Sequence, residues 1–173
     1  FVAAVAMTDT LTALLPDASP LSCKWPNDLL INQRKVGGIL LESFKAGEES
    51  DQWVVVGVGG NVDSFPNDAD FPATCLTEAG VELISAKIVL SRFIHHFIDR
   101  YNEWNASGFA PIRAEWLRMA WGMGERMCAR LPDKEIEGVL DSIDEHGNLV
   151  LILPGDKRQY IQAADVFPAA VKG

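Results

Sequence analysis

Three stretches of the chain carry apolar residues at helical spacing. In the first, Met7, Leu11 and Leu14 recur at i, i+4 and i+7, so they share one face of a helix. The longest stretch has an apolar stripe formed by Leu90, Phe93, Ile94, Phe97, Ile98, Tyr101 and Trp104. The spacing therefore predicts helices over residues 1–15, 81–104 and 111–120.

Between the first two helices the pattern changes to short apolar runs separated by polar turns. The runs cover residues 29–31, 36–44 and 53–56, and Pro26 opens a turn before the first of them. Such runs favour an antiparallel meander. The run Trp53–Val56 is apolar at every position, and we expect this strand to be buried on both faces.

From about residue 121 the chain consists of short alternating runs divided by turns that are rich in Gly, Pro, Asn and Asp. The expected strands cover residues 126–131, 135–144, 149–153 and 159–166. The sequence thus predicts an α+β fold, in which a mixed or antiparallel sheet packs with helices and a small all-β barrel follows. We place the domain boundary between residues 1–120 and 121–173.

Composition and charge narrow the possible functions. The 173 residues are 48% apolar and 23% charged, as in a folded domain, and the net charge is −9. That acidity argues against a broad surface for nucleic acid or an anionic membrane. No apolar run approaches the ~20 residues that span a bilayer. The start of the chain has no basic leader, so we expect no secretory signal, and it has no initiator Met, so we expect further residues upstream. Its three cysteines form no disulfide framework, so we expect a protein of the reducing cytoplasm.

The cysteines and histidines do not suggest a metal centre or a disulfide framework. Cys23, Cys75 and Cys128 are odd in number and none belongs to a C-x-x-C pair. His95 and His96 are adjacent, so they point in different directions on a helix. We expect structural roles for these residues.

Three short segments carry candidate chemistry. Residues 24–28, Lys-Trp-Pro-Asn-Asp, set a cation and a carboxylate around a rigid turn, although Pro-Asn-Asp also forms ordinary turns. Residues 35–42 place a lysine before paired glycines in a strand, which marks either close approach of a ligand or backbone, or a β-bulge with an exposed lysine. Residues 57–62 offer bare backbone N–H groups at a strand end. The glycines do not open a helix, so a dinucleotide fingerprint is excluded.

In this order and spacing, the three segments resemble the biotin protein ligase family through about residue 120, and the last fifty residues resemble its C-terminal barrel. The resemblance implies an enzyme that joins biotin to ATP, giving biotinoyl-AMP and pyrophosphate. The biotinoyl group then passes to a lysine of a biotin carboxyl carrier domain. The resemblance implies ATP with Mg²⁺ and biotin as substrate, whereas the acidity and the short apolar runs predict no nucleic-acid or membrane partner for this chain.

The family's functional residues carry over to matching positions of this sequence. Lys35 matches the catalytic lysine, which stabilises charge between the carboxylate and the α-phosphate. The positions that match biotin-binding residues are Gly38, Leu40, Gly57 and Gly59. Those that match nucleotide-binding residues are Lys24, Asn27, Asp28 and Asn61, with Mg²⁺ near Asp28 and Asn61. Trp25 is expected to be a packing residue.

Two departures from the family pattern keep other functions open. The family's Gly-Arg-Gly-Arg-x-Gly-Arg loop is absent from these residues, and it normally precedes the first helix. Gly60 stands where the family usually has Ile or Val, which removes an apolar contact at the strand end. The alternatives are a lipoate or octanoate ligase or transferase, and a degenerate relative that binds a ligand without catalysis.

Overall fold

The computed structural model describes residues 1–16, 19–45, 47, 52–66, 68 and 71–169. The chain begins with helix α1 (Val2–Thr12), whose residues are buried on almost every side. Such all-round burial requires cover from more than one element, and α1 indeed contacts the sheet and both other helices. The predicted first helix is confirmed.

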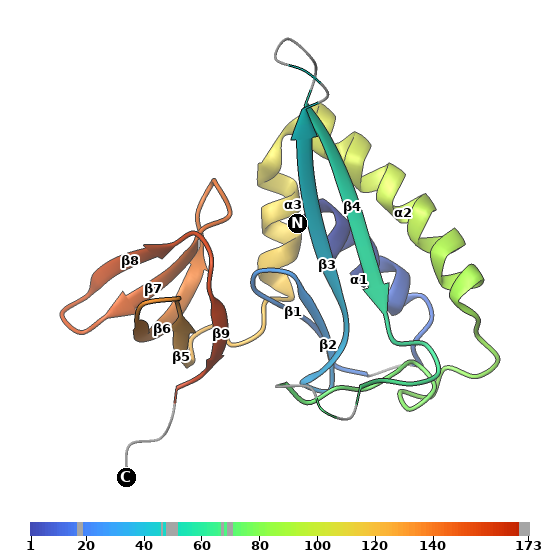
Figure 1. Cartoon of the computed structure of the whole chain (residues 1–173), viewed down its shortest axis with the longest axis horizontal. Coiled ribbons are helices and arrows are strands. Elements are labelled where there is room, and N and C mark those ends of the chain that lie inside the picture. Colours follow the sequence, from blue (N-terminus) through green and yellow to red (C-terminus); the bar gives the residue numbers. More distant parts are fainter. Residues whose placement is uncertain (17–18, 46, 48–51, 67, 69–70, 170–173) are drawn as a thin grey trace.

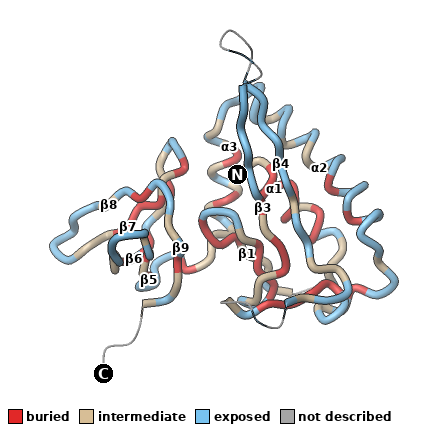
Figure 2. Tube along the Cα trace, viewed as in Figure 1, coloured by how far each residue is buried: buried red, intermediate tan, exposed pale blue. Residues whose placement is uncertain are grey.

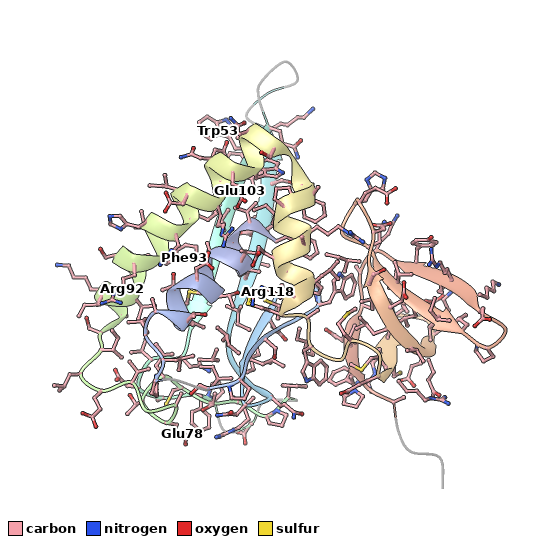
Figure 3. All side chains as sticks on the ribbon, turned by 180° about the vertical axis from the view of Figure 1, so that it is seen from behind. Trp53, Glu78, Arg92, Phe93, Glu103 and Arg118 are labelled. Atoms are coloured by element: carbon pink, nitrogen blue, oxygen red, sulfur yellow. The ribbon has the colours of Figure 1, made fainter. Side chains whose placement is uncertain are left out.

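A four-stranded antiparallel sheet follows α1, with strands in the order β1 (Leu21–Lys24), β2 (Asp28–Ile31), β3 (Arg34–Lys45) and β4 (Gln52–Gly60). The predicted meander is therefore confirmed. The helices lie on one side of this sheet, and the two opposite views show no described element over the other side of β3 and β4 (Figures 1 and 3).

The second helix, α2 (Ala86–Ser107), begins five residues later than predicted because Ser85 caps its N-terminus through the backbone N–H of Ile88. It ends at Gly108, whose φ of 74° suits glycine, and α3 (Phe109–Arg118) follows at once. Most of the predicted apolar stripe of α2 is exposed, and Phe93 is its buried member.

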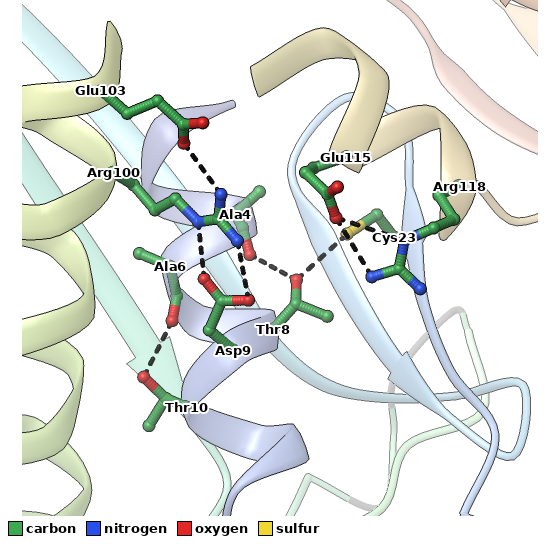
Figure 4. A network of polar contacts seen from close by, with 10 residues as sticks. All are labelled: Ala4, Ala6, Thr8, Asp9, Thr10, Cys23, Arg100, Glu103, Glu115 and Arg118. Carbon is green, nitrogen blue, oxygen red and sulfur yellow. Dashed lines mark hydrogen bonds and ion pairs between the residues drawn. The ribbon is translucent and has the colours of Figure 1, made fainter. Parts of the chain in front are cut away.

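Polar contacts join α1 to its neighbours (Figure 4). Arg100 of α2 donates two hydrogen bonds to the carboxylate of Asp9, at 2.7 and 3.2 Å, and a third to Glu103. The bonds to Asp9 raise the pKa of the guanidinium. On the other side of α1, the Thr8 hydroxyl lies 3.5 Å from the Cys23 thiol. Burial raises the pKa of this thiol to about 11.

The expected burial of Trp53–Val56 on both faces is wrong. The side chain of Trp53 is 60% exposed, and Val54, Val55 and Val56 are also exposed. Figure 2 shows this half of β3 and β4 as exposed, and Trp53 lies near the end of the hairpin in Figure 3. The run pairs with β3 alone, so its apolar composition reflects strand propensity rather than burial between two layers.

Residues 126–168 contain a second antiparallel sheet of five strands in the order β8-β7-β6-β5-β9. Its strands are β5 (Arg126–Arg130), β6 (Glu135–Ile143), β7 (Leu149–Leu153), β8 (Lys157–Ile161) and β9 (Asp165–Pro168). The strand predicted over 159–166 is in fact two, because the chain turns after Ile161 and crosses to pair with β5. The α+β fold class with a small all-β module is confirmed. Among the described residues, no helix is both long and apolar enough to cross a membrane.

Candidate active site

The glycine-bearing strands lie directly beside each other. Gly38 pairs with Gly59, and Leu40 pairs with Gly57, across β3 and β4. Directly opposed residues of antiparallel strands point to the same face, so these four positions share one side of the sheet. Asp28 of β2 pairs with Gly38 and extends the row. The four positions predicted to bind biotin are thus brought together on the side of the sheet away from the helices.

A β-bulge brings Lys35 to this same side. Lys35 and Gly38 are three residues apart, so a regular strand would point them to opposite faces. The register between β2 and β3 shifts at Leu29 and Leu30, which adds one residue to β3. The extra residue in a bulge turns the side chains that precede it to the opposite face of the strand. The Lys35 ammonium consequently lies 3.5 Å from the position that a Cβ on Gly38 would occupy.

The Lys35 ammonium is held by a carboxylate. Its Nζ lies 2.5 Å from Asp28 Oδ1, while Asp28 Oδ2 lies 3.3 Å from the Nζ of Lys24. The Lys35 side chain is 39% exposed, and those of Asp28 and Lys24 are 11% and 5% exposed. Lys35 is therefore the cation of this cluster that a ligand can reach.

The side chains of the two asparagines predicted at the site donate hydrogen bonds to backbone carbonyls. The Asn27 side chain donates to the carbonyl of Ile39 at 2.7 Å, which ties the turn before β2 to β3. The Asn61 side chain donates to the carbonyls of Thr74, at 2.9 Å, and Lys35, at 3.4 Å. Both amides thus fix the strand that carries the lysine.

Gly60 lies on the opposite face, toward the helices. It pairs with Gly37, one position out of phase with Gly38 and Gly59, and a Cβ on Gly60 would meet Met7 of α1 at 3.4 Å. An apolar cavity of about 260 Å³ lies on this side, lined in part by Met7, Val58, Gly60 and Phe93. An Ile or Val at this position would therefore contact the helices. The glycine at position 60 does not change the side of the sheet that carries Gly38 and Gly59.

Trp25 has a role that the sequence does not reveal. Its buried indole donates to the carbonyl of Gly147, 3.0 Å away in the turn between β6 and β7. Asp144 shapes that turn by accepting from the backbone N–H groups of His146 and Asn148. Burial opposes ionisation of Asp144, but the bonds from Asn148 and His146 outweigh it and lower its pKa. Trp25 thus joins the predicted active-site turn to the C-terminal module.

Comparison with known families assigns both parts of the chain. Residues 1–118 match the model described as the biotin/lipoate A/B protein ligase family. The chain belongs to the biotin/lipoate A/B protein ligase family. Residues 123–167 match the biotin protein ligase C-terminal domain, so the two matches meet near the domain boundary predicted at residue 120.

Relatives of this family member are named as ligases. The biotin–[acetyl-CoA-carboxylase] ligase of Paracoccus denitrificans is 38% identical over 172 residues, covering 96% of this chain and 71% of the relative. The bifunctional ligase/repressor BirA of Bacillus subtilis is 39% identical over 134 residues, and the match covers 40% of its length. The biotin protein ligase of Aquifex aeolicus, solved with biotin and ATP, superposes with a TM-score of 0.81 at 22% identity, over 97% of this chain and 70% of that one. At that identity the likeness shows a shared fold.

Proposed function

We propose that this family member is a biotin protein ligase that forms biotinoyl-AMP from biotin and ATP and then biotinylates a carrier-domain lysine. The observation that carries the proposal is the placement of the Lys35 ammonium beside the glycine row of β3 and β4. A bare backbone wall admits a flat ligand, and the adjacent cation suits its carboxylate. The 38% identity to a named biotin–[acetyl-CoA-carboxylase] ligase supports the choice of substrate.

In the first step, a carboxylate oxygen of biotin attacks the α-phosphorus of ATP. An O–P bond forms, the bond to the β-phosphate oxygen breaks, and pyrophosphate leaves. Both reactants are anions, so a cation held between them stabilises the charge that develops in the transition state. Lys35 supplies it as a point charge. In the second step, the carrier amine attacks the biotinoyl carbonyl and AMP leaves.

The nucleotide side of the site is proposed to lie at the edge formed by Asn27, Asp28 and Asn61, with the buried Lys24 behind Asp28, where it holds the carboxylate and does not touch the nucleotide. Among the described residues, no three His, Cys, Asp or Glu side chains converge to hold a metal ion. Mg²⁺ prefers oxygen ligands and is commonly bound through one or two carboxylates and substrate phosphates. Both oxygens of Asp28 contact lysines, so we propose that Mg²⁺ is held mainly by the phosphates of the ATP that brings it, near this edge.

Biotin is favoured over lipoate or octanoate as the substrate. An eight-carbon chain needs an apolar tunnel that ends at the lysine, whereas the apolar cavity described above lies on the helix side of the sheet. The carrier protein is proposed as the second partner, in the cytoplasm, where carrier and ATP are both available.

The test is formation of an acyl-adenylate by the full-length protein. We would incubate it with Mg·ATP and biotin, lipoate or octanoate, and trap the product with hydroxylamine. Lys35→Ala is expected to lower the rate by roughly 100- to 1000-fold, the usual effect of removing one preorganised charge contact. Lys45→Ala is the matched control, because Lys45 is an exposed lysine at the other end of β3.

Each outcome is informative. Product with biotin alone, lost in Lys35→Ala and kept in Lys45→Ala, supports the proposal. Product with lipoate or octanoate assigns the chain to that branch of the family. No product with any of the three acids indicates a degenerate relative, and an unchanged rate in Lys35→Ala shows that Lys35 has no catalytic role.

A further inference from the structure

Asp28 is shared between two lysines, of which Lys24 is buried and Lys35 is partly exposed, so a ligand can reach Lys35. Its Oδ1 contacts Lys35 and its Oδ2 contacts Lys24. The cluster therefore holds two cations and one anion. If Asp28 had Lys35 as its only partner, the two charges would cancel, and the site would stabilise less of the negative charge that develops between the reacting anions in the transition state.

Lys24 is fixed in place by aromatic rings from both parts of the chain. Its ammonium lies 5.2 Å from the ring centre of Phe71 and 5.4 Å from that of Phe167. These are distances at which a buried ammonium is attracted to a ring face. Phe167 belongs to β9, so a strand of the C-terminal module contacts the buried lysine at the end of β1.

These contacts form a continuous path from the C-terminal module to the ligand side of the sheet. The Phe167 ring contacts the Lys24 ammonium, Lys24 holds one oxygen of Asp28, and the other oxygen holds Lys35. We propose that Lys24 and Phe167 are positioning residues that keep Asp28 divided between two lysines and so leave Lys35 with uncancelled positive charge. The inference rests on the proposed function, since Lys35 is taken as the catalytic cation.

Loss of Lys24 should redirect the carboxylate. In Lys24→Met, both oxygens of Asp28 can turn to Lys35, and the charge of the cluster falls from +1 to 0. The lysine is then drawn toward Asp28 and away from the reacting anions. Loss of the Phe167 ring face should have the same effect in weaker form, because Lys24 remains but is less firmly held.

The test measures acyl-adenylate formation by the full-length protein with separate kcat and KM values. Lys24→Met is expected to lower kcat roughly tenfold, a change of about 1.4 kcal/mol in the barrier, with KM for ATP and biotin nearly unchanged. Phe167→Leu should lower kcat less, and Phe167→Tyr, which keeps the ring, should restore it. Arg130→Gln is the matched control, because Arg130 also lies over the Phe167 ring, at 4.9 Å, without contacting the cluster.

A rise in KM for ATP at unchanged kcat would overturn the inference, since it would make Lys24 a nucleotide contact. Equal losses in Phe167→Leu and Phe167→Tyr would also overturn it, because only packing would then matter. Crystal structures of wild type and Lys24→Met give a readout that needs no activity. We expect both Asp28 oxygens to contact the Lys35 ammonium in the variant. An Asp28 carboxylate in the same position as in wild type would refute the positioning role of Lys24. An inactive wild type would refute the proposed function alone.

Discussion

Gly37 and Gly60 are directly opposed on β3 and β4, yet the structure predicts opposite effects for the same substitution at the two positions. A Cβ on Gly37 would lie 2.6 Å from the carbonyl oxygen of Gly59, a backbone atom that cannot move without shifting β4. A Cβ on Gly60 would meet only the terminal methyl of Met7, at 3.4 Å. That methyl ends a flexible side chain and can move by a few tenths of an ångström.

The expected magnitudes follow from these contacts. Overpacking a tight interior typically costs ~1–3 kcal/mol, and Gly37→Ala should destabilise the protein by that amount. Gly60→Ala carries no comparable clash and reduces the conformational entropy of the unfolded chain. It should therefore stabilise the protein by ~0.5–1 kcal/mol. The free energies of unfolding of the two alanine variants should differ by about 1.5–4 kcal/mol.

The assay is urea unfolding followed by tryptophan fluorescence, with the free energy of unfolding taken by linear extrapolation and the slope checked for constancy. Wild type and both variants are measured at one pH and salt concentration. Equal destabilisation by the two substitutions would refute the reasoning, because it would show that the close approach of Gly37 to the neighbouring backbone is not what distinguishes them. Gly60→Ala should also keep wild-type acyl-adenylate formation, since Gly60 faces the helices.

Three further predictions concern the site, its connection to the C-terminal module and a buried thiol. Gly38→Ala places a methyl 3.3 Å from Asp28 Oδ1 and 3.5 Å from the Lys35 ammonium. Both groups end side chains that can move, so acyl-adenylate formation should fall roughly tenfold while the free energy of unfolding in urea changes by less than ~0.5 kcal/mol. Trp25→Phe leaves the Gly147 carbonyl without its indole donor and should lower the free energy of unfolding by ~1–3 kcal/mol, measured by urea unfolding. Burial raises the pKa of Cys23 from 9.0 in the unfolded chain to about 11 in the folded protein. The neutral thiol therefore contributes its full stabilisation below pH 9, and the free energy of unfolding falls by ~1.4 kcal/mol per pH unit between pH 9 and 11. Urea midpoints at pH 8 to 11 should fall less steeply in Cys23→Ala than in wild type.

Local patterns in the sequence were sufficient to predict most of the helices and strands in their order along the chain. The helical spacing of Met7 and Leu11 and the polar turns between short apolar runs report directly on backbone preference, which depends on near neighbours. The same reasoning failed for Trp53–Val56, because an apolar strand has the same composition whether or not another layer covers it. It also merged β8 and β9, because β8 pairs with the preceding strand β7 whereas β9 pairs with the distant strand β5.

The motifs likewise indicated which residue types would meet at the site but not how they would be arranged. Lys35 and Gly38 have a spacing that points them to opposite faces of a regular strand, and only the bulge opposite Leu29 and Leu30 brings them together. A bulge depends on the pairing of two strands, so one strand's sequence does not reveal it.

The sequence by itself determined most of the order of the elements, the residues available for chemistry and the resemblance that names their roles, because these depend on neighbours along the chain. Only the tertiary structure decided that Asp28 is divided between two lysines, that Gly60 faces the helices, and that Trp25 and Lys24 reach residues of the C-terminal module more than a hundred positions away. Those contacts join parts of the chain that no local pattern links, and they form only when the strands and the two sheets pack together.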